Sequence, residues 1–278
     1  MVNMTGCRAW LSWKRSCGLP VLAALLVLAA GCEHEREAGI TVVTSTTMIE
    51  AVVKEIGGTT VAVEALVPGG MCPGHFDLKP RQMKEIERSD LFLYHGWEHW
   101  LPKVTEATGL GTRIVGIDVP GEWMVPDVHI QAIHNVRDVM TSLRPENADY
   151  YRERARAYED SVLMESGTIC SRLRRYMGTP VICSDLQADL LTWAGFDVLE
   201  TYGRAESMSP RTIEGLIKTG RLHKVRLVVD NKQSGPSVGA GVALEIGAEH
   251  VVLTNFPLEG SYLDALRSNV KALESKLD

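Results

Sequence analysis

The chain has no excess of positive charge and lacks two motifs that are common in enzymes. It contains 29 Lys and Arg residues against 35 Asp and Glu residues, which gives a formal charge of −6. Nucleic acids and anionic membranes bind basic surfaces, so this balance argues against both partners and suits a site for a cation. The sequence also offers no acid/base dyad of a hydrolase and no phosphate-binding loop. We therefore expect a binding protein and not an enzyme, with no nucleic-acid partner.

Long apolar runs are also scarce, and the only one lies near the N-terminus, from Leu19 to Ala30. Basic residues precede it, and Leu28-Ala29-Ala30-Gly31-Cys32 at its end resembles a bacterial lipobox. The run is too short to cross about 30 Å of hydrocarbon. We predict that residues 1–32 are a lipoprotein signal, in preference to simple secretion or a retained anchor, and that residues 33–39 are a tether. Acylated Cys32 then anchors the protein to a bacterial membrane, in the periplasm or on the cell surface.

Cysteine is sparse beyond this signal. Cys7 and Cys17 leave with the signal, so Cys72, Cys170 and Cys183 remain in the body of the protein. Three is an odd number for a disulfide framework in an oxidising compartment. Either one pair forms a disulfide, or some of these thiols have another function.

The body of the chain alternates strand-like and helix-like segments, over residues 40–117 and again over residues 180–277. This β-α-β order predicts parallel sheets with covering helices. Residues 150–177 lie between them and contain no Pro, which predicts one long helix. We predict an α/β fold of two small lobes, each a parallel sheet covered by helices, bridged by one long rigid helix. The expected boundaries are 40–143 for the N-terminal lobe, 144–177 for the linking helix and 178–278 for the C-terminal lobe.

One loop in the first half carries candidate metal ligands. Met71–Pro80 follows an apolar strand-like run, Val61–Val67, and precedes a helix-like run that begins near Arg81. It holds Cys72 and His75 on a path that Pro and Gly restrict. Thiolate and imidazole bind metal ions, and open α/β sheets bind ligands at the carboxyl ends of their strands. The loop therefore indicates a metal site, against the alternative of a turn with an incidental His.

A series of short motifs along the chain resembles one known family. The motifs are Ile56-Gly57-Gly58, Leu66-Val67-Pro68-Gly69, His75 with Asp77 and Lys79-Pro80, Ser89-Asp90-Leu91, Arg144-Pro145-Glu146-Asn147, Tyr150-Tyr151, and Tyr262 ahead of Arg267-x-Asn269. In this order the chain resembles the TroA-like metal-receptor lipoproteins of bacterial ABC importers for zinc and manganese, over nearly the whole mature chain. Members of that family hold one divalent cation between two lobes with four side chains, mostly His, Asp and Glu.

The resemblance assigns two of the four ligands directly and departs from the family at the second. His75 matches the first His, and Asp185 matches the third ligand, which follows the strand after the long helix. Gly121 stands where the second His is expected. His129 and His134 lie nearby, but their spacing does not match the family pattern.

The fourth ligand, an acid in the family, falls at Asn255 or at the adjacent Thr254. An Asn offers a carbonyl oxygen but no charge, so two of the usual ligand positions are weakened. Cysteine can compensate, because Cys72 shares the loop of His75. Cys183 faces the same side of its strand as the third ligand if the strand continues that far. We hypothesise a cleft site that is built from Cys72, His75, Cys183 and Asp185, with Asn255 at the fourth family position.

A rival explanation fits the same two cysteines: they form an interlobe disulfide or are small buried apolar side chains. As ligands, thiolate and imidazole favour Zn²⁺, or a softer ion such as Cu⁺, over Mn²⁺, which prefers oxygen ligands. The resemblance implies a protein that captures a divalent metal ion, zinc in preference to manganese, and delivers it to the permease and ATPase of an ABC importer. The alternatives are a surface adhesin or interaction lipoprotein with a decayed metal site, and a receptor for a metal chelate.

Overall fold

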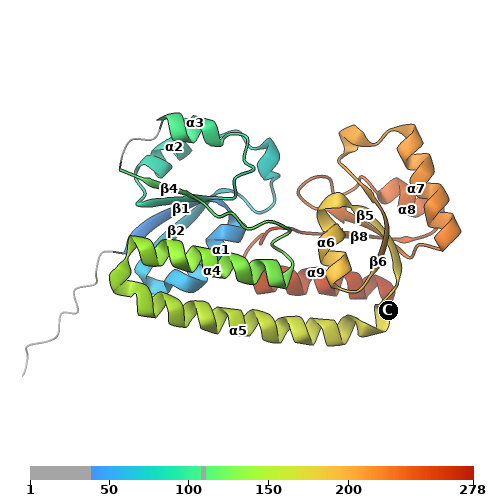
Figure 1. Ribbon diagram of the computed structural model, residues 1–278. Helices are drawn as coiled ribbons and strands as arrows, with labels where there is room; N and C mark the ends of the chain where they lie inside the picture. Colours follow the sequence, from blue (N-terminus) through green and yellow to red (C-terminus); the bar gives the residue numbers. More distant parts are fainter. Residues whose placement is uncertain (1–38, 108–110) are drawn as a thin grey trace, which may run out of the picture. The chain divides into compact units, whose positions relative to one another are not determined.

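The computed structural model describes residues 39–107 and 111–278, and these residues form two parallel four-stranded sheets (Figure 1). The first sheet has the order β2-β1-β3-β4, from β1 Ile40–Thr46, β2 Val61–Val67, β3 Leu91–Tyr94 and β4 Arg113–Gly116. The second has the order β6-β5-β7-β8, from β5 Pro180–Ser184, β6 Asp197–Tyr202, β7 Leu227–Asn231 and β8 Glu249–Leu253. The predicted pair of parallel sheets is therefore confirmed, whereas the predicted signal and Cys32 lie outside the described residues.

Helices cover both faces of each sheet. They are α1 Thr47–Gly57, α2 Pro80–Glu87, α3 Leu101–Ala107, α4 Pro126–Leu143, α5 Ala148–Leu173, α6 Ala188–Trp193, α7 Pro210–His223, α8 Ala240–Ile246 and α9 Tyr262–Leu277. The outer face of the first sheet packs against α2 and α3 around Phe92 and Trp100, and the outer face of the second packs against α7 and α8 around Val228. This covering of both faces explains the continuous apolar character of the strands.

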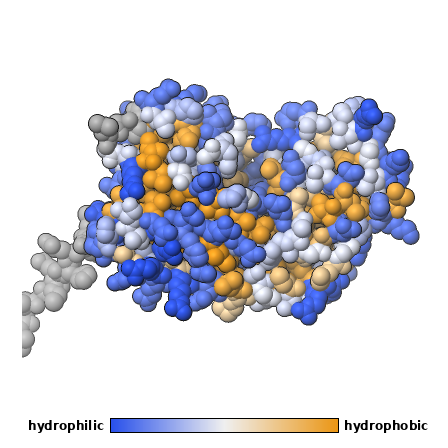
Figure 2. Space-filling model, viewed as in Figure 1, coloured by the Kyte–Doolittle hydropathy of each residue, from blue (hydrophilic) through white to orange (hydrophobic). Residues whose placement is uncertain are grey.

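The predicted long helix is confirmed as α5, which has 26 residues and links the two lobes. A single turn of 3₁₀ helix, Pro145–Asn147, precedes it, because the fixed φ of Pro145 suits a first helical turn. Figure 2 shows hydrophilic side chains over much of the lower edge of the molecule, where α5 runs. In the described part of the chain, no helix combines the length and apolar character that a membrane span requires.

One apolar core joins the inner faces of the two sheets. It includes Val42 of β1, Ile49 of α1, Val181 of β5 and Leu266 of α9, all of which are buried. The C-terminal helix α9 packs against β8 of its own lobe and also against α1 and α5. The two lobes are therefore joined by a shared core as well as by the linking helix.

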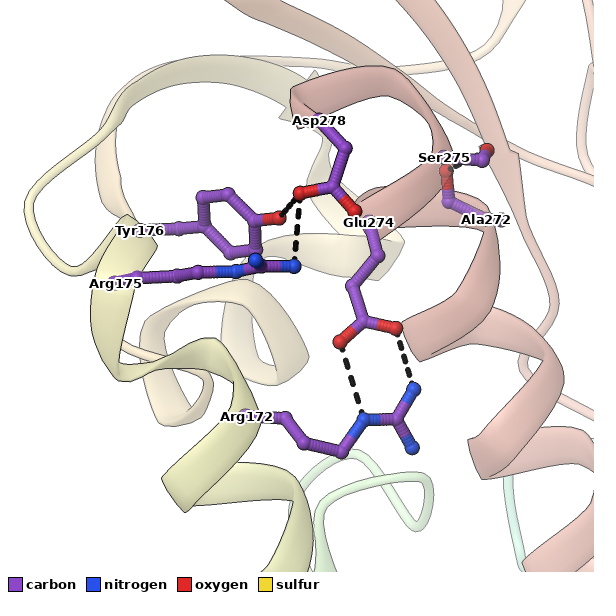
Figure 3. A network of polar contacts seen from close by, with 7 residues as sticks. All are labelled: Arg172, Arg175, Tyr176, Ala272, Glu274, Ser275 and Asp278. Carbon is purple, nitrogen blue, oxygen red and sulfur yellow. Dashed lines mark hydrogen bonds and ion pairs between the residues drawn. The ribbon is translucent and has the colours of Figure 1, made fainter.

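Polar contacts also join the C-terminal end of the linking helix α5, and the turn that follows it, to the C-terminal helix α9 (Figure 3). The guanidinium of Arg172 donates to both carboxylate oxygens of Glu274. The Asp278 carboxylate accepts from the Tyr176 hydroxyl and pairs with Arg175 at 2.8 Å. Pairs that are exposed to this degree contribute at most about 1 kcal/mol each, so the core dominates the stability of the junction.

The two histidines near the missing second ligand serve helix packing instead. His129 of α4 is fully buried, stacks on Tyr262 of α9 with ring centroids 3.5 Å apart, and bonds the Tyr158 hydroxyl of α5 through Nε2 at 2.8 Å. His134 pairs with Glu159 of α5 at 2.9 Å. These contacts agree with the spacing argument that neither residue is the second family His.

The buried His129 predicts a pH-dependent stability. Burial lowers the pKa of His129 from 6.5 to about 3. The unfolded chain therefore takes up a proton at this residue below pH 6.5 while the folded chain does not. The contribution of His129 to the stability of the fold is thus complete above that pH and is lost as the pH falls. When the pH falls from 7 to 5, the free energy of unfolding should drop by about 2 kcal/mol less in His129→Gln than in the unsubstituted protein, as measured by urea denaturation. His223→Gln, at an exposed position, is the control, and an equal acid loss in all three proteins contradicts the prediction.

Candidate metal site

The candidate site lies where loops at the carboxyl ends of the strands of the two lobes meet. The Gln233 side chain, after β7, donates to the Gly69 carbonyl oxygen at 2.6 Å, and the Thr47 hydroxyl donates to the Pro257 carbonyl oxygen at 2.8 Å. Gly69 must be glycine, because a Cβ atom there would lie 1.9 Å from the Pro257 oxygen. The loop that carries Cys72 and His75 is thus held against the C-terminal lobe.

Cys72 and His75 share one partner from the opposite lobe, Arg204. His75 closes a single 3₁₀ turn, Pro73–His75, in which its N–H donates to the Cys72 carbonyl at 3.1 Å. The Arg204 guanidinium, which follows β6, lies 2.8 Å from Nε2 of His75 through Nη1 and 3.1 Å from Sγ of Cys72 through Nη2. Since an arginine can only donate, His75 accepts through Nε2 and carries its proton on Nδ1. The two predicted ligands of this loop therefore present their free electron pairs to one point in the cleft.

Asp185 lies in the facing loop of the C-terminal lobe. It is exposed and begins a 3₁₀ turn, Asp185–Gln187, immediately after β5. Its Oδ1 accepts from the Leu186 N–H at 2.8 Å, while its Oδ2 lies beside Gly203, next to Arg204. The structure therefore places Asp185 close to the loop that reaches Cys72 and His75.

Cys183 lies apart from this group. Its side chain is fully buried in the shared core with Val181, and burial, assisted by the negative charge of Asp185, raises the pKa of its thiol to about 12. The strand ends at Ser184, so the alternation that was expected to align Cys183 with Asp185 does not extend that far. Cys72, Cys170 and Cys183 are free thiols, so the interlobe disulfide is not formed. Cys183 occupies the position of a buried apolar side chain, and its role as a ligand stays a prediction.

Asn255 is the centre of a buried hydrogen-bond network between the lobes. Its Oδ1 accepts from Nδ2 of Asn231 at 2.8 Å and from Nε2 of Gln187. Its Nδ2 donates to Oε2 of Glu122 at 2.7 Å and to the Leu186 carbonyl at 2.9 Å. All four hydrogen-bonding positions of the amide are occupied. To bind a metal, Asn255 must give up one of these bonds.

Glu122 is a residue of the cleft that the sequence did not indicate. Burial raises the pKa of its carboxyl group to about 7, and Asp189 adds to this effect. The preceding Gly121, which the sequence resemblance predicts at the second ligand position, has a φ of 102°, a conformation that a His adopts only with strain. This backbone conformation disfavours a His at position 121, and the next residue carries a carboxyl group. The assignment of Gly121 to the second ligand position stays a prediction.

His95 follows β3 at the same edge of the sheet and packs against aromatic side chains. Its Nε2 lies 2.9 Å from the Thr46 hydroxyl, and its ring stacks on Trp97 and meets Trp123 edge-on, with centroids 4.4 Å apart. Burial lowers its pKa to about 4, so it is neutral. Within residues 39–107 and 111–278, no group of three or more His, Cys, Asp or Glu side chains is arranged to hold a metal ion.

One sequence pattern near the site matches an enzyme motif by its letters alone. Residues 235–239 read Gly-Pro-Ser-Val-Gly, the spacing of a nucleophile elbow. Asp230 bonds Nε2 of His250 at 2.6 Å and the Gly239 N–H at 3.0 Å, but in the described part of the chain the exposed Ser237 hydroxyl bonds no histidine. The arrangement provides no activated nucleophile.

Two parallel-sheet lobes, joined by one long helix and meeting at their polar loops, define a two-lobed ligand receptor. Over residues 42–276 the chain matches the family described as ZnuA, zinc-uptake complex component A, periplasmic, and it belongs to that family. The predicted family resemblance is confirmed.

Relatives and solved structures agree with this assignment. The high-affinity zinc uptake system protein ZnuA of Bacillus subtilis is 22% identical, with 95% of this chain and 98% of the relative covered. The manganese-binding lipoprotein MntA of Halalkalibacterium halodurans is 25% identical over 52% of this chain and 55% of the relative. A crystal structure of ZnuA superposes with a TM-score of 0.76 at 16% identity and covers 86% of this chain and all of its own, which shows the shared fold.

The Asn255 network predicts a large loss of stability when its centre is removed. Asn255→Ala removes the hydrogen-bond partner of three atoms, Nδ2 of Asn231, Nε2 of Gln187 and Oε2 of Glu122. We expect a loss of about 2–4 kcal/mol in the free energy of unfolding, measured by urea denaturation without metal. Asn135→Ala, which removes one exposed hydrogen bond within α4, should change it by less than about 0.5 kcal/mol. Similar small losses in both variants would show that the network contributes little.

Proposed function

We propose that this protein captures a divalent metal ion outside the cytoplasm, zinc in preference to manganese, and delivers it to the permease and ATPase of an ABC importer. One observation supports the proposal in addition to family membership. The imidazole of His75 directs the electron pair of Nε2 towards Arg204 of the opposite lobe, and the family resemblance predicts His75 as the first ligand. A neutral imidazole in that tautomer is the form that binds a metal ion.

The ligand set that we propose begins with His75, Cys72 and Asp185, because their loops meet at one edge of the two sheets. Imidazole, thiolate and carboxylate together suit Zn²⁺ better than Mn²⁺, which prefers oxygen ligands. Cys183 and Asn255 can join this set only at a cost in free energy. Cys183 must lose a proton against its burial, and Asn255 must break a hydrogen bond.

The cellular setting is a further part of the proposal. The relatives include a zinc-binding lipoprotein, AdcA of Streptococcus pneumoniae, and the manganese-binding lipoprotein MntA, and both names support a lipid anchor. We propose that Cys32 carries this anchor, so that the protein is held at a bacterial membrane in the periplasm or at the cell surface. The family match favours metal uptake over an adhesin or a chelate receptor, and it supports a transport component over an enzyme.

The central test is metal binding by the purified, reduced, metal-free protein. Calorimetric titration should show one equivalent of Zn²⁺ bound more tightly than Mn²⁺. His75→Ala should weaken Zn²⁺ binding about 100-fold, because one of few strong ligands is lost. His223→Ala, at an exposed position of α7, should bind as the unsubstituted protein does. Tight Zn²⁺ binding that survives His75→Ala would contradict the proposal.

A further inference from the structure

We propose that Arg204 competes with the metal ion inside the protein itself. Its guanidinium contacts the predicted ligand atoms of Cys72 and His75, and it must leave them before a metal can bind there. The inference rests on the metal-capture function proposed above and concerns the regulation of that site. It makes Arg204 a determinant of affinity that comes from the lobe opposite Cys72 and His75.

The contact with His75 excludes a metal by geometry. Nη1 of Arg204 lies 2.8 Å from Nε2 of His75. A zinc ion bound by an imidazole nitrogen lies about 2.0–2.1 Å from it, along the same electron pair. That electron pair serves one partner at a time, so the guanidinium and the metal exclude one another.

The second contact extends this exclusion to Cys72. Nη2 of Arg204 lies 3.1 Å from Sγ of Cys72, so one guanidinium engages two predicted ligands through two nitrogens. An arginine stays charged at all accessible pH values and offers donors only, as a metal offers only positive charge. Arg204 thus takes the place of the cation in charge as well as in position.

Local structure on both sides of the cleft accommodates this arginine. The Arg204 carbonyl accepts from the N–H of Ser207 at 2.9 Å and from its hydroxyl at 2.7 Å, which fixes the turn that carries it. Across the cleft, a Cβ atom at Gly74 would lie 3.2 Å from Nη2, closer than most side-chain contacts. Glycine at position 74 therefore gives the guanidinium room between the two ligands of the loop.

The charge around Arg204 supports competition between this residue and the metal ion. In the part of the chain that the structure describes, no Asp or Glu forms an ion pair with Arg204, and its guanidinium bonds Cys72 and His75. Its positive charge is therefore uncompensated by a direct partner and repels an incoming divalent cation at short range. The apparent affinity for the metal is reduced by the fraction of molecules in which Arg204 holds the site.

The first experiment measures Zn²⁺ affinity in variants of this residue. Arg204→Ala should bind Zn²⁺ about tenfold more tightly than the unsubstituted protein, since the competing state is removed. Arg204→Lys, which keeps the charge but loses the planar pair of donors, should show a smaller gain. Arg211→Ala removes an exposed arginine of α7 in the same lobe and should leave the affinity unchanged.

The second experiment needs no metal. A double-mutant cycle with His75→Ala and Arg204→Ala, read from urea midpoints of the metal-free protein, should be non-additive because the two side chains contact each other. Additive midpoints would overturn the inference. A cycle with His75→Ala and Arg211→Ala should be additive and is the matched control.

The outcomes separate this inference from the proposed function. If Zn²⁺ binds through His75 but Arg204→Ala binds no tighter, or binds more weakly, the competitor role is overturned and metal capture stands. If neither the unsubstituted protein nor Arg204→Ala binds Zn²⁺ or Mn²⁺, metal capture and the competitor role fall together. If only Arg204→Ala binds Zn²⁺, the competitor role is supported in its strongest form.

Discussion

The shared apolar core between the two sheets is the constraint on which the rest of the structure depends. Because β1 and β5 both turn an inner face to the same core, with α9 packed against α1 and α5, the lobes meet at the carboxyl ends of their strands. The polar groups at these ends must find partners across the boundary. Examples are the contacts of Gln233 with Gly69, Asn255 with Glu122, and Arg204 with His75. The boundary between the lobes is thus a set of polar contacts that the shared apolar core brings close together.

This arrangement gives the predicted site an unusual set of charges. The family resemblance predicts ligands at Asn255, Gly121 and His75; an amide stands at the first of these positions, a glycine with positive φ at the second, and an arginine contacts the third. An amide and a glycine supply no negative charge, and the arginine adds positive charge. If the protein captures metal as proposed, the arginine must move, which links affinity to a rearrangement of one side chain more than to a large motion of the lobes.

The sequence predicted the architecture well because strong periodic signals define it. The apolar strands and the Pro-free segment that became α5 appear where they were expected. Side chains that bond the backbone set local details that periodicity does not show. Glu98 accepts from the N–H groups of His95 and Gly96, and α3 begins after it, at Leu101. The site was harder to predict. Arg204 is 129 residues from His75 in sequence, and no local pattern in its loop indicates the contact.

The most direct test of this account is a crystal structure of the zinc-loaded protein. The account predicts one zinc ion between the lobes, with Nε2 of His75 as a ligand and the Arg204 guanidinium turned away from His75 and Cys72. A zinc ion bound elsewhere, with the contact between Arg204 and His75 intact, would contradict it.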